Sequence, residues 1–164
     1  MIEIDPIKEV REDHLKVRDV LLSLMDAIRN RDVEKAFELL LILEKLGGPH
    51  FRMEEEVMYK KLRKFYGDEY YNRLLDEHDR VINAAKQIAE ILGKGSITED
   101  EAERIIRIIQ SDILPHPITC SGLEILLERL SEEELKEIAE SIRVCREEDV
   151  PLLEWAETIR ERKA

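Results

Sequence analysis

The chain of 164 residues contains four histidines, and each falls on the inward-facing side of a predicted amphipathic helix. They are His14, His50, His78 and His116. Histidine is a poor core residue, and four independent positions would all face inward only about one time in a hundred. Inward imidazoles at a similar depth converge in a dry helical interior, where they can share a metal ion. The four histidines therefore predict a metal site.

A carboxylate accompanies one of these imidazoles. Glu54 follows His50 by one helical turn, so both side chains lie on the same helix face, in the spacing that ligates one metal centre. Glu54 is the one carboxylate that we expect inside the fold. Its neighbours Glu55 and Glu56 point away from this face and are expected to be solvated.

Helical periodicity dominates the chain and strand-like alternation is hard to find, so we expect an all-α fold. A first helix is predicted over residues 7–28. Asp32 caps a second helix, which Gly47-Gly48-Pro49 is predicted to interrupt. A third helix follows a turn at Tyr66-Gly67-Asp68 and ends at Gly93-Lys94-Gly95.

The fourth predicted helix carries His116 in the longest stretch without Asp, Glu, Lys or Arg, residues 113–123. Thr98 with Glu101 forms a capping box at its start. Prolines at positions 115 and 117 predict a kink, because each lacks the N–H of a normal helical hydrogen bond. Asp112 either accepts a hydrogen bond from an imidazole or marks this kink.

The connections between these helices are short, which predicts an up-down-up-down four-helix bundle over residues 1–130. A C-terminal helical extension, residues 131–164, is expected to pack on the bundle within the same domain. Ser131 with Glu134 caps its first helix. The last helix bears an apolar stripe formed by Leu152, Trp155, Ala156 and Ile159. We expect the stripe to pack on the bundle, and a homo-oligomer contact is the alternative.

Composition excludes several classes of partner. The chain has 26 Lys and Arg against 38 Asp and Glu, a formal charge of −12, so no basic face is available for nucleic acid. No apolar run is long enough to span a membrane. The acidic N-terminus without an apolar leader favours a cytoplasmic location. Scarce Asn and Gln beside abundant Glu, Lys and Arg are typical of thermophile proteins.

The histidines also indicate an internal duplication. The segment around His14 is similar in character to the segment around His78, and His50 and His116 each directly follow a proline. The whole pattern, with His50-x-x-x-Glu54 in the second helix, resembles the hemerythrin-like (HHE cation-binding) family over roughly residues 8–130.

The resemblance implies a four-helix bundle that holds a non-haem di-iron centre through histidines and two carboxylates. It implies ligand positions at His14, His50, Glu54, His78 and His116.

The chain departs from the family pattern at Cys120, which stands where the second bridging carboxylate belongs. Glu124, one turn farther on, would replace that carboxylate only if the kinked helix were shifted. Three interpretations follow: a single iron or zinc bound by histidines with Glu54 or Cys120, an atypical dinuclear site that uses Cys120 or Glu124, or a degenerate site. A thiolate ligand favours iron or zinc over manganese or magnesium, whereas Cys120 is otherwise an inert buried thiol.

The leading hypothesis is a metal-binding protein, with iron as the metal, that binds, senses or handles O2, NO, reactive oxygen species or iron itself. The resemblance implies the same small ligands. A second hypothesis is a redox enzyme that reduces superoxide or peroxide at a His/Cys iron site. A third is a bundle with a structural metal that serves as an interaction module. These three hypotheses include both an enzyme and proteins without catalytic activity, and the sequence favours neither class.

Overall fold

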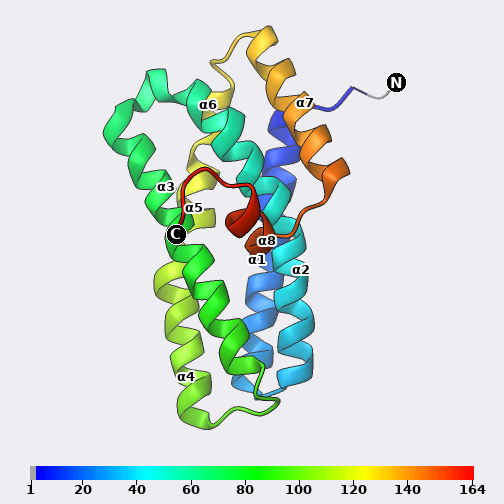
Figure 1. Cartoon of the computed structure of the whole chain (residues 1–164). Coiled ribbons are helices and arrows are strands. Elements are labelled where there is room, and N and C mark those ends of the chain that lie inside the picture. The colour runs from blue at the N-terminus through cyan, green and yellow to red at the C-terminus, as the bar shows by residue number, and fades with distance from the viewer. Residues whose placement is uncertain (1–2) are drawn as a thin grey trace.

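A computed structural model describes residues 3–164, and in this range all regular secondary structure is helical (Figure 1). The elements in chain order are α1 (Pro6–Arg29), α2 (Val33–Met53), the π-helical segment η1 (Glu54–Met58), α3 (Tyr59–Leu92), α4 (Glu99–Ile108), the π-helical segment η2 (Ile109–Ile113), α5 (Pro115–Gly122), α6 (Glu124–Leu127), α7 (Glu132–Glu148) and α8 (Leu152–Thr158). The predicted all-helical fold is confirmed for this part of the chain. None of its helices is long and apolar enough to cross a membrane.

Side-chain caps begin the helices where the sequence predicts them. Asp32 accepts a hydrogen bond from the Lys35 amide at the start of α2. Complete capping boxes begin α4 at Thr98 and α7 at Ser131. Each cap satisfies amide groups that have no partner within the helix and is worth about 1 kcal/mol. These local signals therefore fix where three helices begin, among them α2, which carries His50.

The predicted interruption at Gly47-Gly48-Pro49 is wrong, because α2 runs through all three residues. Gly48 instead allows the backbone of the segment before α8 to approach α2 closely. A Cβ atom at this position would lie 2.0 Å from the carbonyl oxygen of Val150 in the segment before α8. Packing of that segment against the bare helix face outweighs the helical hydrogen bond lost at Pro49. At Gly67 the predicted turn is confirmed, with a φ of 79° between two helical stretches.

Two π-helical segments lie beside the histidines. Segment η1 continues α2 directly after Met53 and begins with Glu54. Segment η2 lies within the fourth predicted helix, where the Leu114 amide donates to the Ile109 carbonyl oxygen at 2.8 Å. This bond spans five residues rather than four, so the helix gains a wide turn just before Pro115. The predicted kink is therefore present as a π turn followed by a new helix.

The elements pack into a helical bundle with α1 alongside α2, and α3 alongside η2, which continues α4 (Figure 1). Its core consists of two apolar clusters, and the histidines lie between them. On α1, Val10 belongs to one cluster, Leu21 belongs to the other, and His14 lies between them. On α3, His78 lies between the two clusters in the same way. The bundle thus carries a thin polar layer with apolar packing on both sides.

The C-terminal helices pack against this layer from one side. Both α7 and α8 contact α2, and α8 also contacts α3 (Figure 1). In α8, Leu152, Trp155 and Ala156 are buried, whereas Ile159, directly after this helix, is 40% exposed. Most of the apolar stripe is therefore covered within the chain.

Candidate metal centre

The four histidines converge from four helices, α1, α2, α3 and α5. All four side chains are buried. The Nε2 atoms of His78 and His116 lie 3.0 Å apart, and the rings of His14 and His50 meet edge to face at 5.0 Å between centroids. The imidazoles thus form two pairs in one polar layer.

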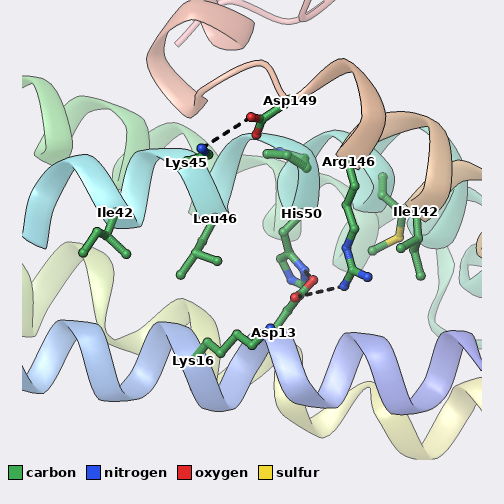
Figure 2. A pocket seen from close by; sticks show the side chains of 11 residues that line it. Asp13, Lys16, Ile42, Lys45, Leu46, His50, Ile142, Arg146 and Asp149 are labelled. Carbon is green, nitrogen blue, oxygen red and sulfur yellow. Dashed lines mark hydrogen bonds and ion pairs between the residues drawn. The ribbon is translucent and has the colours of Figure 1, made fainter.

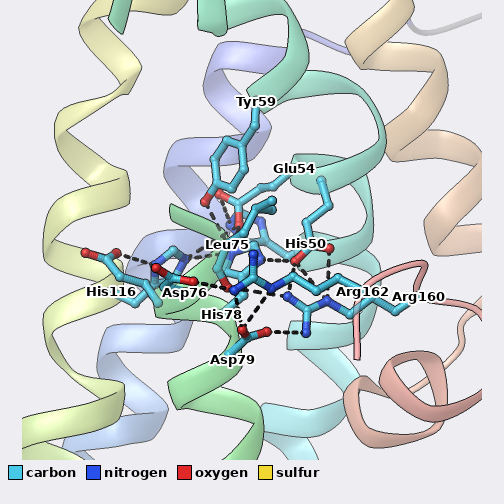
Figure 3. A network of polar contacts seen from close by, with 12 residues as sticks. His50, Glu54, Tyr59, Leu75, Asp76, His78, Asp79, His116, Arg160 and Arg162 are labelled. Carbon is cyan, nitrogen blue, oxygen red and sulfur yellow. Dashed lines mark hydrogen bonds and ion pairs between the residues drawn. The ribbon is translucent and has the colours of Figure 1, made fainter. Parts of the chain in front are cut away.

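Glu54 lies between the two pairs and is completely buried (Figure 3). Its Oε1 atom is 3.2 Å from Nε2 of His78 and 3.7 Å from Nε2 of His116. Its Oε2 atom is 3.3 Å from Nε2 of His50. One carboxylate oxygen therefore faces each pair of imidazoles.

Two overlapping groups of donor atoms result, and within each group the atoms lie within 4.8 Å of one another. The first group is His14, His50, Glu54 and Cys120, and the second is Glu54, His78 and His116. Glu54 belongs to both. The structure thus brings together every candidate ligand that the sequence offers except Glu124.

Cys120 contributes a buried thiol whose Sγ is in very short contact with Oε2 of Glu54. Burial and repulsion from Glu54 work to raise the pKa of this thiol, but the imidazoles of His116, His14 and His50 outweigh them and lower the pKa to about 6. Two acidic groups in such close contact, away from water, are suited to share a cation.

The donor atoms fit a transition-metal ion. Nε2 of His14 is buried and has no hydrogen-bond partner among the described residues. A buried polar atom without a partner costs free energy, and coordination to a metal would provide the missing interaction. Imidazole, carboxylate and thiol donors together suit iron or zinc better than magnesium or calcium.

Each of the four imidazoles also donates a hydrogen bond from Nδ1 to a carboxylate. The pairs are His14 with Glu124 at 2.9 Å, His50 with Asp13 at 3.0 Å, His78 with Glu55 at 2.6 Å and His116 with Glu77 at 2.9 Å. Such bonds hold the ring in place and leave Nε2 free for a metal, an arrangement typical of histidine ligands.

These outer carboxylates correct two expectations from the sequence. Glu55 is not solvated, because it contacts His78, whereas Glu56 is exposed as expected. Glu54 is not the one carboxylate inside the fold, because Glu124 is buried as well. Glu124 contacts Nδ1 of His14, on the side of the ring opposite Nε2. Asp112 lies in η2, and Glu77 takes the outer position at His116.

Opposite charges inside the polar layer stabilise one another. Burial works to raise the pKa of the Glu54 carboxyl, but attraction to His50 and hydrogen bonds with the imidazoles hold the pKa well below its usual range. Burial works to lower the pKa of His50, but Glu54 and Asp13 outweigh this effect and raise it well above its usual value. Without a metal, the negative charge of the carboxylates thus favours the protonated form of His50. A bound metal ion would supply positive charge in place of that proton.

Arginines support three of the four outer carboxylates. Arg11 pairs with Glu124 at 2.9 Å, Arg146 with Asp13 at 3.2 Å and Arg160 with Glu55 at 2.9 Å. Figure 2 shows Asp13 and Arg146 beside a surface pocket of about 280 Å³, which also includes His50 in its lining. The chains through Arg11 and Arg146 reach the protein surface, whereas the chain through Arg160 ends inside the fold.

Tyr59 is a site residue that the sequence did not reveal. Its completely buried hydroxyl lies 3.2 Å from Nε2 of His78 and 3.5 Å from Sγ of Cys120 (Figure 3). Burial, together with the negative charge of Cys120 and Glu54, raises its pKa well above the usual value, so the phenol stays protonated. Tyr59 follows Glu54 by five residues across η1, so a search at the α-helical spacing of four does not find it.

A cavity of about 60 Å³ lies beside His14, His50 and His116. Its remaining wall is almost entirely apolar and includes Val17, Leu40, Leu43, Val81, Ala85 and Leu152. About one probe sphere, roughly 10–15 Å³, is enough to hold a water molecule, so the cavity has room for a small molecule.

Comparison with known proteins gives one match. The family model described as "Hemerythrin HHE cation binding domain" matches residues 5–116. No curated protein and no solved structure matches the chain.

Proposed function

The chain belongs to the hemerythrin HHE cation-binding family, and we propose that its buried centre binds two metal ions, iron in preference to zinc, beside a site for a small ligand. The ligands we propose are O2, NO or a reactive oxygen species. The observation that carries this proposal is the position of Glu54, a completely buried carboxylate that belongs to both groups of donor atoms.

His14, His50, Cys120 and one oxygen of Glu54 would hold the first metal ion. The second would bind to His78, His116 and the other oxygen of Glu54. Helices α1, α2, α3 and the α4–α5 region supply these residues, which supports an up-down-up-down four-helix bundle over residues 1–130 with residues 131–164 as an extension packed on it.

Iron is favoured because the donor set combines nitrogen, oxygen and sulfur and leaves room for a ligand from outside. Iron bound there would supply the capacity to bind or reduce a diatomic molecule. The first group offers four protein ligands and the second offers three. The second half of the centre is therefore the more open one.

The surrounding residues select the small ligand. The cavity wall favours an uncharged diatomic molecule, because apolar side chains make no hydrogen bonds with water or ions. Phe51 stacks on the ring of His78 at 3.8 Å between centroids and excludes water from one face. Tyr59 presents a hydroxyl proton within the centre and can donate it to a ligand beside His78.

A redox enzyme that reduces superoxide or peroxide is the second candidate function. Two observations favour it: the thiol of Cys120 in the first group and the protonated Tyr59, 3.5 Å from that thiol. A thiolate ligand makes the metal richer in electrons, and a nearby phenol supplies a proton.

Metal analysis after anaerobic purification tests the proposal. We expect one iron for each of the two groups. After oxidation, a thiolate-to-iron charge-transfer band is expected that disappears in Cys120→Ser. Cys145→Ser is the matched control, since Cys145 is also a buried thiol but lies outside both groups, and it should keep the band.

The absence of any stoichiometric transition metal would overturn the metal-binding function. A band that persists in Cys120→Ser would exclude this residue as a ligand. Turnover of superoxide or peroxide by the iron-loaded protein, with an added external electron donor, distinguishes the redox enzyme from a protein that only binds or senses its ligand.

A further inference from the structure

Arg160 is a buried arginine in the segment that follows α8, and only 3% of its surface is exposed. It lies outside the matched family region, which ends at residue 116. Figure 3 shows its guanidinium extending from this segment toward Asp79 and His78 on α3. A buried guanidinium is costly unless acceptors satisfy its donors, so the contacts of Arg160 indicate what it does.

The guanidinium binds Glu55 through both oxygens of the carboxylate. Nε of Arg160 donates to Oε1 at 3.0 Å, and Nη2 donates to Oε2 at 2.9 Å. Nη1 donates to Oδ1 of Asp79 at 2.7 Å. Two parallel bonds from a planar guanidinium fix both the position and the rotation of a carboxylate. Arg160 therefore leaves Glu55 little freedom.

Glu55 in turn fixes His78. Its Oε2 atom accepts the hydrogen bond of His78 Nδ1 at 2.6 Å, the shortest of the four imidazole–carboxylate contacts. The stacked ring of Phe51 blocks movement of His78 toward one face, and the bond to Glu55 opposes movement within the ring plane. Nε2 of His78 is thereby aimed at Glu54 and His116.

We propose that Arg160 is a positioning residue of the second half of the metal centre. It holds Glu55 against His78, so the C-terminal extension contributes to the orientation of a metal ligand. The inference rests on the proposed metal-binding function and extends it to residues beyond the matched family region.

Arg146 and Arg162 show why Arg160 is singled out. Arg146 pairs with Asp13, the outer carboxylate of His50, as Arg160 pairs with Glu55, the outer carboxylate of His78. The side chain of Arg146 is 39% exposed, however, so water screens its ion pair with Asp13. Arg162 lies two residues from Arg160 and pairs with Asp76 and Asp79, but it does not contact Glu55. Arg162→Gln is therefore the matched control for Arg160→Gln.

The test is cobalt(II) loading followed by challenge with a chelator. Total cobalt per chain reports both halves of the centre, whereas the thiolate-to-cobalt absorption band reports the half that contains Cys120. In Arg160→Gln, the affinity for the cobalt that gives no thiolate band is expected to fall, by at most the roughly 10- to 100-fold typical of losing the direct partner of a histidine ligand, here Glu55. The thiolate band should persist, and Arg162→Gln should match the parent protein.

Two further variants separate positioning from folding. Arg160→Lys keeps the charge but loses the two parallel bonds, so it should lie between the parent and Arg160→Gln. In Glu55→Gln protein, adding Arg160→Gln should cause little further loss of cobalt, because Arg160 acts through Glu55. Equal loss from both halves, or unchanged affinity in Arg160→Gln, would overturn the positioning role. A parent protein that takes up no cobalt would overturn the proposed function and, with it, the role of Arg160.

Discussion

Glu54→Gln is the substitution that tests the shared carboxylate most directly. Gln has nearly the same shape, so packing around this completely buried position is preserved while the negative charge is lost. The two halves of the centre should respond unequally. Without Glu54 the first group keeps three donors, His14, His50 and Cys120, whereas the second keeps only two histidines.

We therefore expect the bound metal to fall from two ions per chain to one, with the remaining ion in the half that contains Cys120. In the metal-free protein the same change removes one partner of a buried set of ion pairs. Breaking such a pair typically costs about 3–5 kcal/mol of unfolding free energy. Glu54 contacts three imidazoles, so the loss should lie in this range and not near zero.

Metal analysis and urea denaturation of the metal-free protein measure the two effects. Glu56→Gln is the control, because Glu56 lies in the same π-helical segment but is exposed, and its ion pair with Arg52 is screened by water. If Glu54→Gln retained two metal ions with unchanged affinity, Glu54 would not be a shared ligand. An unfolding free energy equal to that of Glu56→Gln would refute the electrostatic part of the argument.

Four other predictions follow from the geometry. Ala85→Leu should fill the cavity beside the histidines, so metal content stays constant while the rate of oxygen uptake, followed by stopped-flow absorption, falls. Tyr59→Phe should keep both metal ions but weaken ligand binding or slow ligand reduction, measured by titration with NO and by peroxide turnover. Gly48→Ala should lower the unfolding free energy by about 1–3 kcal/mol or more in denaturant melts, because its Cβ would meet the Val150 carbonyl oxygen. Metal uptake should release protons into weakly buffered solution and weaken as the pH falls, because the pKa of His50 is raised in the metal-free protein and imidazole must be neutral to coordinate.

The inner part of the site could be predicted because helical periodicity determines it. The burial of His14 and of His78 follows from a spacing of three and four residues along single helices, and Glu54 follows from its distance to His50. None of these inferences needs knowledge of how the helices pack. The all-helical fold follows from the same pattern and from the caps at Asp32 and Thr98.

The outer part could not be predicted, for two physical reasons. Segment η1 adds a wide turn directly after Met53, so Glu55 and Tyr59 face the interior although the α-helical period places them elsewhere. Arg160 reaches Glu55 across 105 residues of sequence, and no local pattern records such a pair. For Pro49, the local rule gives the wrong answer because packing against the Val150 segment outweighs it.

The regular placement of the histidines extends to two of the four outer carboxylates, Asp13 and Glu77. In the first half, Asp13 accepts the Nδ1 hydrogen bond of His50, and in the second half Glu77 accepts that of His116. Each acid directly precedes the other histidine of its half, so one helix supplies an inner ligand and an outer carboxylate from adjacent positions.

The segments that follow His50 and His116 differ four residues after the histidine, where the first has Glu54 and the second has Cys120. A carboxylate has two oxygens and can serve both metal ions, whereas the thiol belongs to one group of donor atoms only. Because Cys120 belongs to the donor group of His14 and His50, the group of His78 and His116 has fewer donors and depends more on the fixed orientation of His78. The buried arginine of the extension acts on this histidine. Cys120 in place of a carboxylate and Arg160 behind Glu55 therefore both distinguish the donor group of His78 and His116 from that of His14 and His50.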